Sequence, residues 1–239
     1  LDVFFQNLPG NRNVDAIIEA SFDFDEAKKQ VLGELTIPVV GINAPSTHGL
    51  DAGAAINDEA AMGTVVKFLK SLGHETLAYV EQPVNASPFI CSDVIRKRGF
   101  LEAAKQCGYK DDDIILMPSL PRMDTRNEQD VYSSIVAQLF SAPKQPTGIC
   151  VSVDAAATPL IKELRRMGWR VPQDVSVIGF DDDPSAAVLN LTTMHQDPVE
   201  IGREAARKTL ALLNRENLAE PFTVMPTSLV LRDTTARKN

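Results

Sequence analysis

Three consecutive carboxylates, Asp181, Asp182 and Asp183, follow a run of β-forming residues in the segment VSVIGFDDDPS (175–185). In open α/β folds, ligands bind just beyond the carboxyl ends of the strands, because side chains and helix N-termini converge there. Asp181 stands at such an end, where a carboxylate can accept hydrogen bonds from a ligand. Alternatively, DDDPS is a solvated turn that caps a helix. We expect two of the three aspartates to have that structural role and one to bind a ligand.

No further pattern in the sequence supports catalysis or metal binding. The phosphate-binding glycine loops, the HExxH zinc motif and the GxSxG elbow are absent. The histidines are isolated from one another, and the cysteines lie far apart in apolar or helical surroundings, which suits reduced core thiols. These residues are His48, His74, His195, Cys91, Cys107 and Cys150. We therefore predict no enzyme, no catalytic residue, no metal and no cofactor.

Length and charge limit the classes of protein. The chain has 239 residues, 44% of them hydrophobic, which is enough for one large core or two smaller ones. Its formal net charge of -8 argues against nucleic-acid binding by this stretch alone, because nonspecific affinity comes from clustered Lys and Arg. No apolar run approaches the roughly 18 residues that cross a bilayer, and no secretory leader is visible after Leu1. These features favour a cytoplasmic protein without a membrane partner.

Short β-rich runs alternate with helical patterns, which is typical of parallel sheets with helical crossovers. The β-rich runs are 14–20, 37–43, 76–80, 113–118, 148–153 and 175–180, and the helical patterns are 58–72, 92–108, 154–168 and the segment from 197 onward. The alternation breaks after Gly108 and again at 189–197, so we expect two lobes. Their predicted boundaries are 1–110 with 197–214 for the N-terminal lobe and 111–196 with 215–239 for the C-terminal lobe. We also expect the first β-α-β unit of the first lobe to be missing, because the sequence opens with a helix end that leads into the strand at Val14.

An ordered set of motifs runs through most of the chain: LGHETLAYV, RKRGFLEAAKQCG, QPTGICVSVD, MGWRVPQDVSVIGFDD, LTTMHQDPVEIGREA and TSLVLRDTT. Together they resemble the effector-binding region of the LacI/GalR family of bacterial transcription regulators over about residues 14–237. The resemblance implies a periplasmic-binding-protein-like α/β fold, in which two Rossmann-like lobes with parallel sheets are joined by three crossover segments. It also implies a small molecule, often a sugar or nucleobase, in the cleft between the lobes.

The resemblance assigns ligand-binding residues. Arg96 matches the arginine of the family's R-x-x-G-[FYW] segment, Asp181 the first aspartate of G-[FY]-D-D, and Gln196 the glutamine of LTTxxQ. A guanidinium offers a planar fork for vicinal hydroxyls or a carboxylate. Without the resemblance, Arg96 reads as an exposed helical arginine. Phe22 could line the cleft, and a role in core or hinge packing is an equal alternative.

Other positions of the same motifs read as structural. Asp182 is expected to orient the loop, and Asp58 to cap the helix that it opens. Where the family generally has Asn-Asp before a helix, this chain has Val153-Asp154. Asp154 can still cap that helix, but Val153 cannot bond to a ligand hydroxyl. Either that wall of the pocket is more apolar than in a typical sugar site, or the ligand is smaller or differently placed.

We therefore predict a ligand-sensing domain. In the family, effector binding rearranges the lobes and so controls operator DNA binding by an upstream helix-turn-helix headpiece, which this sequence lacks. The family's assemblies are homodimers or tetramers. Candidate hinges are the segments near 109–113, 189–197 and 214–226. The alternative is a solute-binding protein for transport, which has the same fold.

Overall fold

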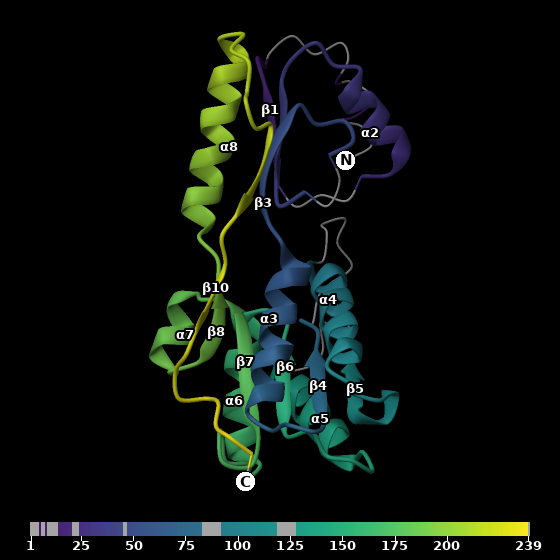
Figure 1. Cartoon of the computed structure of the whole chain (residues 1–239), viewed down its shortest axis with the longest axis vertical. Coiled ribbons are helices and arrows are strands. Elements are labelled where there is room, and N and C mark those ends of the chain that lie inside the picture. Colours follow the sequence, from purple (N-terminus) through teal and green to yellow (C-terminus); the bar gives the residue numbers. More distant parts are fainter. Residues whose placement is uncertain are drawn as a thin grey trace. The chain divides into compact units, whose positions relative to one another are not determined.

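The structure of this chain is a computed structural model, and it describes Phe5, Leu8 and residues 14–20, 24–44, 47–82, 92–118 and 128–238 (Figure 1). These residues form two compact units. Unit 1 contains those up to Asn57 together with Asp197–Pro226, and unit 2 contains those from Asp58 to Gln196 together with the segment after Pro226. Within the described residues, the chain passes between the units at 57–58, 196–197 and 226–227.

Unit 1 is built on a parallel sheet with a helix on each face (Figure 1). Its strand order is β1-β2-β3-β9, and the helices whose bounds the structure describes are α2 and α8. Neighbouring residues of a strand point to opposite faces, so Val39 packs with Leu32 of α2 and Val40 packs with Ala205 of α8. The elements are β1 (Ile17–Ala20), α2 (Glu26–Gly33), β2 (Val39–Ile42), β3 (Ala52–Ile56), α8 (Pro198–Leu213) and β9 (Phe222–Met225).

Unit 2 has a larger sheet of order β10-β8-β7-β6-β4-β5, parallel except for the antiparallel pair of β10 and β8. Its strands are β4 (Leu77–Val80), β5 (Ile114–Met117), β6 (Gly148–Val151), β7 (Ser176–Asp181), β8 (Thr192–His195) and β10 (Ser228–Val230). Its helices are α3 (Asp58–Ser71), α4 (Ser92–Gln106), α5 (Glu128–Ser141), α6 (Asp154–Arg166) and α7 (Pro184–Val188), with a short 3-10 turn η2 (Asp111–Asp113).

Helices cover unit 2 on both faces of the sheet. Residues of α5 and α6 join the strands in one large core, with Leu160 and Val177 both fully buried in it. Helix α4 packs closely on α3, because a Cβ at Gly99 would lie only 2.6 Å from the Cα of Glu59. Helix α4 also packs on the sheet, because the ring of Phe100 contacts the ring of Tyr79 on β4.

The α/β class with parallel sheets is confirmed. The first five β-rich runs contain β1, β2, β4, β5 and β6, the sixth covers β7 except its last residue, Asp181, and the helical patterns contain α3, α4, α6 and α8. The second break, 189–197, contains β8 and the passage to unit 1. The two cysteines within the described residues, Cys107 and Cys150, are free thiols, and Cys91 lies outside the described residues.

The lobe boundaries differ from those predicted. Residues 58–110 were assigned to the N-terminal lobe, but their described part belongs to unit 2, because β4 pairs with β5 and β6. Residues 215–226 were assigned to the C-terminal lobe, but they belong to unit 1, because β9 pairs with β3. The candidate hinge at 109–113 lies inside unit 2, where it connects α4 to β5.

Candidate functional site

The chain turns abruptly where β7 ends. Asp181 and Asp182 have φ angles of 111° and 60°, in the left-handed region that non-glycine residues seldom adopt. Asp183 then caps α7, since its Oδ1 accepts the backbone N–H groups of Ser185 and Ala186 at 2.7 and 3.2 Å. The turn directs three successive carboxylates to three different environments.

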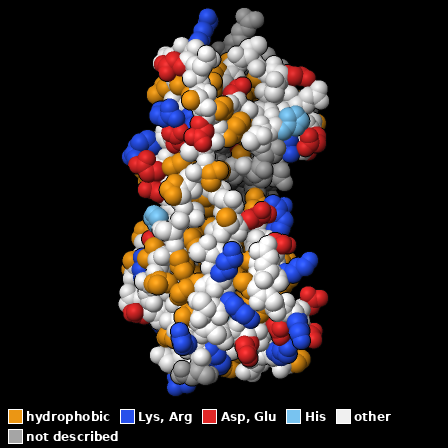
Figure 2. All heavy atoms as spheres, in the orientation of Figure 1, with side chains coloured by type: hydrophobic (Ala, Val, Ile, Leu, Met, Phe, Trp, Pro, Cys, Tyr) orange, Lys and Arg blue, Asp and Glu red, His pale blue; other side chains and the backbone are white. Residues whose placement is uncertain are grey.

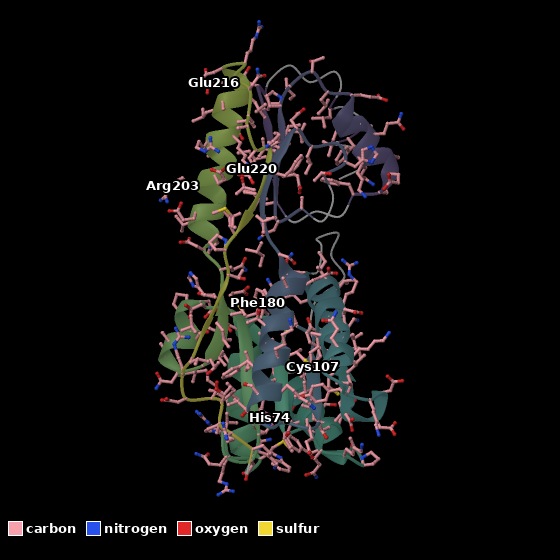
Figure 3. All side chains as sticks on the ribbon, viewed as in Figure 1. His74, Cys107, Phe180, Arg203, Glu216 and Glu220 are labelled. Carbon is pink, nitrogen blue, oxygen red and sulfur yellow. The ribbon has the colours of Figure 1, made fainter. Side chains whose placement is uncertain are left out.

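Arg96 reaches this turn from α4 and is not an exposed helical arginine. Its side chain is only 4% exposed. Its Nε donates to Asp58 Oδ1 at 2.7 Å, one terminal nitrogen donates to the Ser152 carbonyl at 2.5 Å, and the same nitrogen lies 3.3 Å from Asp181 Oδ1. The guanidinium also lies over the Phe180 ring, 3.6 Å from its centroid. Figure 3 marks Phe180 at one end of unit 2, near the first turns of α3 and α4.

Gln196 completes the cluster from the end of β8. Its Nε2 donates to Asp181 Oδ1 at 2.7 Å, which fixes the orientation of the amide, because the flipped amide would place two oxygens together. Its own Oε1 is buried and has no hydrogen-bond partner among the described residues. The structure thus brings together Arg96, Asp181 and Gln196, three of the residues predicted to bind a ligand, whereas Phe22 lies outside the described residues.

The free atoms of this cluster are hydrogen-bond acceptors. Asp181 commits Oδ1 to Gln196 and Arg96, and within the described residues its Oδ2 accepts no hydrogen bond. Burial raises the pKa of Asp181, and the opposing charge of Arg96 limits that rise. The cluster therefore suits a ligand that brings hydrogen-bond donors, such as hydroxyl groups.

Two residues at the site have roles that the sequence did not indicate. Asp58 stands at the start of α3, where it was expected only to cap the helix, but its carboxylate accepts a hydrogen bond from the Nε of Arg96. The cap of α6 is Val153 rather than Asp154, and the Val153 side chain packs against the core of unit 2. The spacing in the sequence carries no signal for the Asp58 contact, since 38 residues separate the two partners.

Asp154 forms a fully buried link beneath the turn. Its Oδ1 accepts the Thr193 hydroxyl at 2.8 Å, and its Oδ2 accepts the Asp183 N–H at 3.1 Å. Burial raises its pKa to about 7. A Cβ at Gly179 would lie 2.0 Å from Asp154 Oδ1, so only glycine fits beside this carboxylate.

A separate groove of about 900 Å³ lies on unit 2 between α4 and β5. Its lining mixes apolar and cationic side chains, including Leu101, Leu116 and Lys105, and contains none of the predicted site residues. In the part of the chain that the structure describes, no group of histidine, cysteine and carboxylate residues could hold a metal ion. No helix there is long and apolar enough to cross a membrane.

Comparison with known proteins decides the family. Residues 66–235, more than half of the chain, match the model of the periplasmic binding protein-like domain. The chain belongs to this family. Among the curated proteins similar to this chain is the ribose operon repressor of Bacillus subtilis, which is 32% identical over 44% of this chain and 33% of its own length. The transcriptional repressor CytR of Escherichia coli is 28% identical over 75% of this chain and 50% of its own.

A solved structure of a LacI family regulator from Enterococcus faecium with bound ribose has the same fold, with a TM-score of 0.78. It is 24% identical, and the match covers 99% of this chain and 85% of that one. These findings confirm the resemblance to the effector-binding region of LacI/GalR regulators. The chain spans between one third and one half of the length of the two curated relatives.

Proposed function

We propose that this chain is the effector-sensing domain of a LacI/GalR-type transcriptional regulator and that a sugar or related polar metabolite binds beyond the end of β7. The observation that carries the proposal is the cluster of Arg96, Asp181 and Gln196, in which two acceptor oxygens have no partner among the described residues. Adjacent hydroxyls of a sugar would supply the matching donors. Phe22 remains a proposed lining residue. The names of relatives point in the same direction, since one is a ribose operon repressor and another structure holds ribose.

The charges around the cluster favour a neutral effector. Among the described residues, Arg96 is the only cation that pairs with Asp181, and it is already paired with Asp58 as well. Arg232 is likewise committed to Asp182. An added phosphate or carboxylate on the ligand would therefore meet carboxylates with no free cation among the described residues of this turn to balance them. We therefore expect a neutral sugar to bind better than its phosphate.

Regulation would follow from unequal affinity of the effector for two arrangements of the protein, because a ligand indifferent to both shifts nothing. Operator DNA would be bound by a helix-turn-helix headpiece outside these 239 residues, in a homodimer or tetramer. Such a regulator acts in the cytoplasm, where operator DNA lies. A transport-binding protein shares the fold, but the relatives named above are regulators, and none of them is an enzyme.

The test is a calorimetric titration of the chain with D-ribose, ribose 5-phosphate, cytidine and xylitol, repeated with Asp181→Asn. We expect a neutral compound to bind. We expect Asp181→Asn to weaken its affinity at least tenfold, because the position of the free carboxylate oxygen is then taken either by an amide NH2 group, which cannot accept a hydrogen bond, or by an uncharged amide oxygen. Absence of binding by every neutral compound would contradict the proposal.

Glu102→Gln is the matched control, because Glu102 is a carboxylate of unit 2 that lines the groove between α4 and β5. The proposal predicts unchanged affinity in this variant. An effect of Glu102→Gln together with none of Asp181→Asn would place the ligand in the groove instead.

A further inference from the structure

The turn at the end of β7 needs external support. Asp181 and Asp182 both have positive φ angles, and backbone of this kind persists only where its surroundings enforce it. The position of the Asp181 carboxylate depends on this turn, because Asp181 is its first residue. Whatever holds Asp182 therefore also sets how Asp181 faces Arg96 and Gln196.

Two side chains hold the Asp182 carboxylate. Arg232 donates to Oδ1 at 2.6 Å, and the His195 ring nitrogen Nδ1 lies 3.1 Å from Oδ2. The Arg232 guanidinium is anchored in turn, because its other terminal nitrogen donates to the Leu191 carbonyl at 2.7 Å. Its backbone N–H donates to the Thr192 hydroxyl at 2.9 Å.

Both partners of Asp182 belong to segments that connect the two units. His195 ends β8, directly before the chain passes to unit 1 at 196–197. Arg232 follows β10, shortly after the chain returns at 226–227. The antiparallel pairing of His195 with Ser228 joins these two segments to each other. Asp182 is therefore the point at which both connections meet the strand end that carries Asp181.

We propose that Arg232 is a positioning residue that, through Asp182 and with His195, holds Asp181 in its ligand-binding orientation and links effector binding to the two connecting segments. The link works in both directions by thermodynamic necessity. A ligand bound to Asp181 stabilises the turn and therefore the contacts of Asp182. Conversely, a shift of either connecting segment that breaks those contacts weakens ligand binding. The inference rests on the proposed function.

The experiment uses Asp182→Asn, Arg232→Ala and Arg232→Lys. Asparagine tolerates a positive φ angle, so Asp182→Asn removes the ion pair without disturbing the backbone preference. Lysine keeps the charge but lacks the planar fork whose two terminal nitrogens reach Asp182 and the Leu191 carbonyl separately. Arg170→Ala is the control, because Arg170 also forms an ion pair with an aspartate of unit 2, Asp174.

The first readout needs no ligand: crystal structures of Arg232→Ala and Asp182→Asn. We expect the turn to relax and the bond between Asp181 and Gln196 to be lost. An unchanged turn in both variants overturns the inference. Should Arg232→Ala fail to fold, Asp182→Asn decides alone. A chain that binds no neutral ligand would defeat the proposed function, while these structures would still decide the positioning role.

The second readout is the Kd of the ligand found by calorimetry. We expect Arg232→Ala to raise it at least tenfold, Arg232→Lys to restore part of the loss, and Arg170→Ala to leave it within twofold. A purely structural role would lower the melting temperature of Arg232→Ala and leave its Kd unchanged, which would contradict the inference. Amide exchange at 193–197 and 229–232 is expected to slow on ligand binding in the unmodified chain but not in Arg232→Ala.

Discussion

At the scale of single residues, the carboxylates around the end of β7 show how strongly partners distant in the sequence determine chemistry. Asp181 has one oxygen without a partner among the described residues, Asp182 is held by Arg232, and Asp183 caps a helix. Asp154, behind them, is fully buried with two donors and no cation bonded to it. It is the residue of this group whose ionisation should be most costly.

Asp154 should make the chain less stable as the pH rises from about 4 to 7. Burial raises its folded pKa to about 7 from the reference 3.8, so in that window the folded state holds a proton that the unfolded state has lost, and the free energy of unfolding falls with rising pH. The total fall is at most about 4 kcal/mol, from roughly three pKa units. Asparagine can accept the Asp183 N–H and donate to the Thr193 hydroxyl. We therefore expect Asp154→Asn to flatten the pH dependence and to be more stable than the unmodified chain at pH 8.

Urea unfolding at pH values from 4 to 8 measures this. Asp174→Asn is the control, since hydrogen bonds from Arg170 lower the pKa of Asp174 to about 2, and its contribution to stability is lost only at lower pH. Some slope will remain in Asp154→Asn, because the pKa of Asp181 is also raised. Equal slopes for Asp154→Asn and the unmodified chain would show that Asp154 is ionised throughout this range.

At the scale of helices and strands, sequence patterns located elements where the pattern was strong. The β-branched run at 175–180 and the helix at 154–168 were both predicted. β3 was missed because AGAAI has small residues and little β-branching, and β9 and β10 because they are short and contain no fully buried residue. The sheet that a strand joins was not predictable, since pairing partners are set by packing rather than by the strand's own sequence. That is why β4 was assigned to the wrong lobe.

Lys208 connects secondary-structure elements by hydrogen bonds that no sequence pattern predicts. It lies on α8 with its side chain fully buried, and its Nζ donates to the carbonyls of Gly53 and Pro221 and to the Thr223 hydroxyl at 2.7 to 2.8 Å. These bonds hold α8 to β3 and β9. We expect Lys208→Met to lower the free energy of unfolding by about 2 kcal/mol, because methionine fills the space but leaves buried acceptors unpaired.

The matched control for this variant is Arg203→Met on the same helix, where Figure 3 labels Arg203. Its side chain is 63% exposed, and among the described residues it pairs with Glu200. Exposed pairs of this kind contribute about 0 to 1 kcal/mol. Guanidinium unfolding of both variants tests the difference. If Lys208→Met is as stable as Arg203→Met, the cost of burying the ammonium equals the gain from its hydrogen bonds.

At the scale of the whole molecule, the net negative charge of the chain argues against DNA binding by these residues. The chain carries 24 Lys and Arg against 32 Asp and Glu. On the face drawn in Figure 2, cationic side chains lie interleaved with acidic ones. Several of the cations are also neutralised by short-range pairs, as Arg166 is by Glu163 and Arg207 by Glu204. Such a surface releases few counterions from a phosphate backbone.

We therefore expect these 239 residues to bind duplex DNA no more tightly than about 10⁻⁴ M at physiological salt, at the weak end of nonspecific binding. Fluorescence anisotropy of a labelled duplex of about 30 base pairs, titrated at several salt concentrations with and without effector, measures this. Saturable binding at low salt that falls steeply as salt rises would reveal a basic surface that the net charge conceals, and the operator would then contact the sensing domain itself. Binding that changes with effector but not with salt would instead require contacts other than those with phosphates.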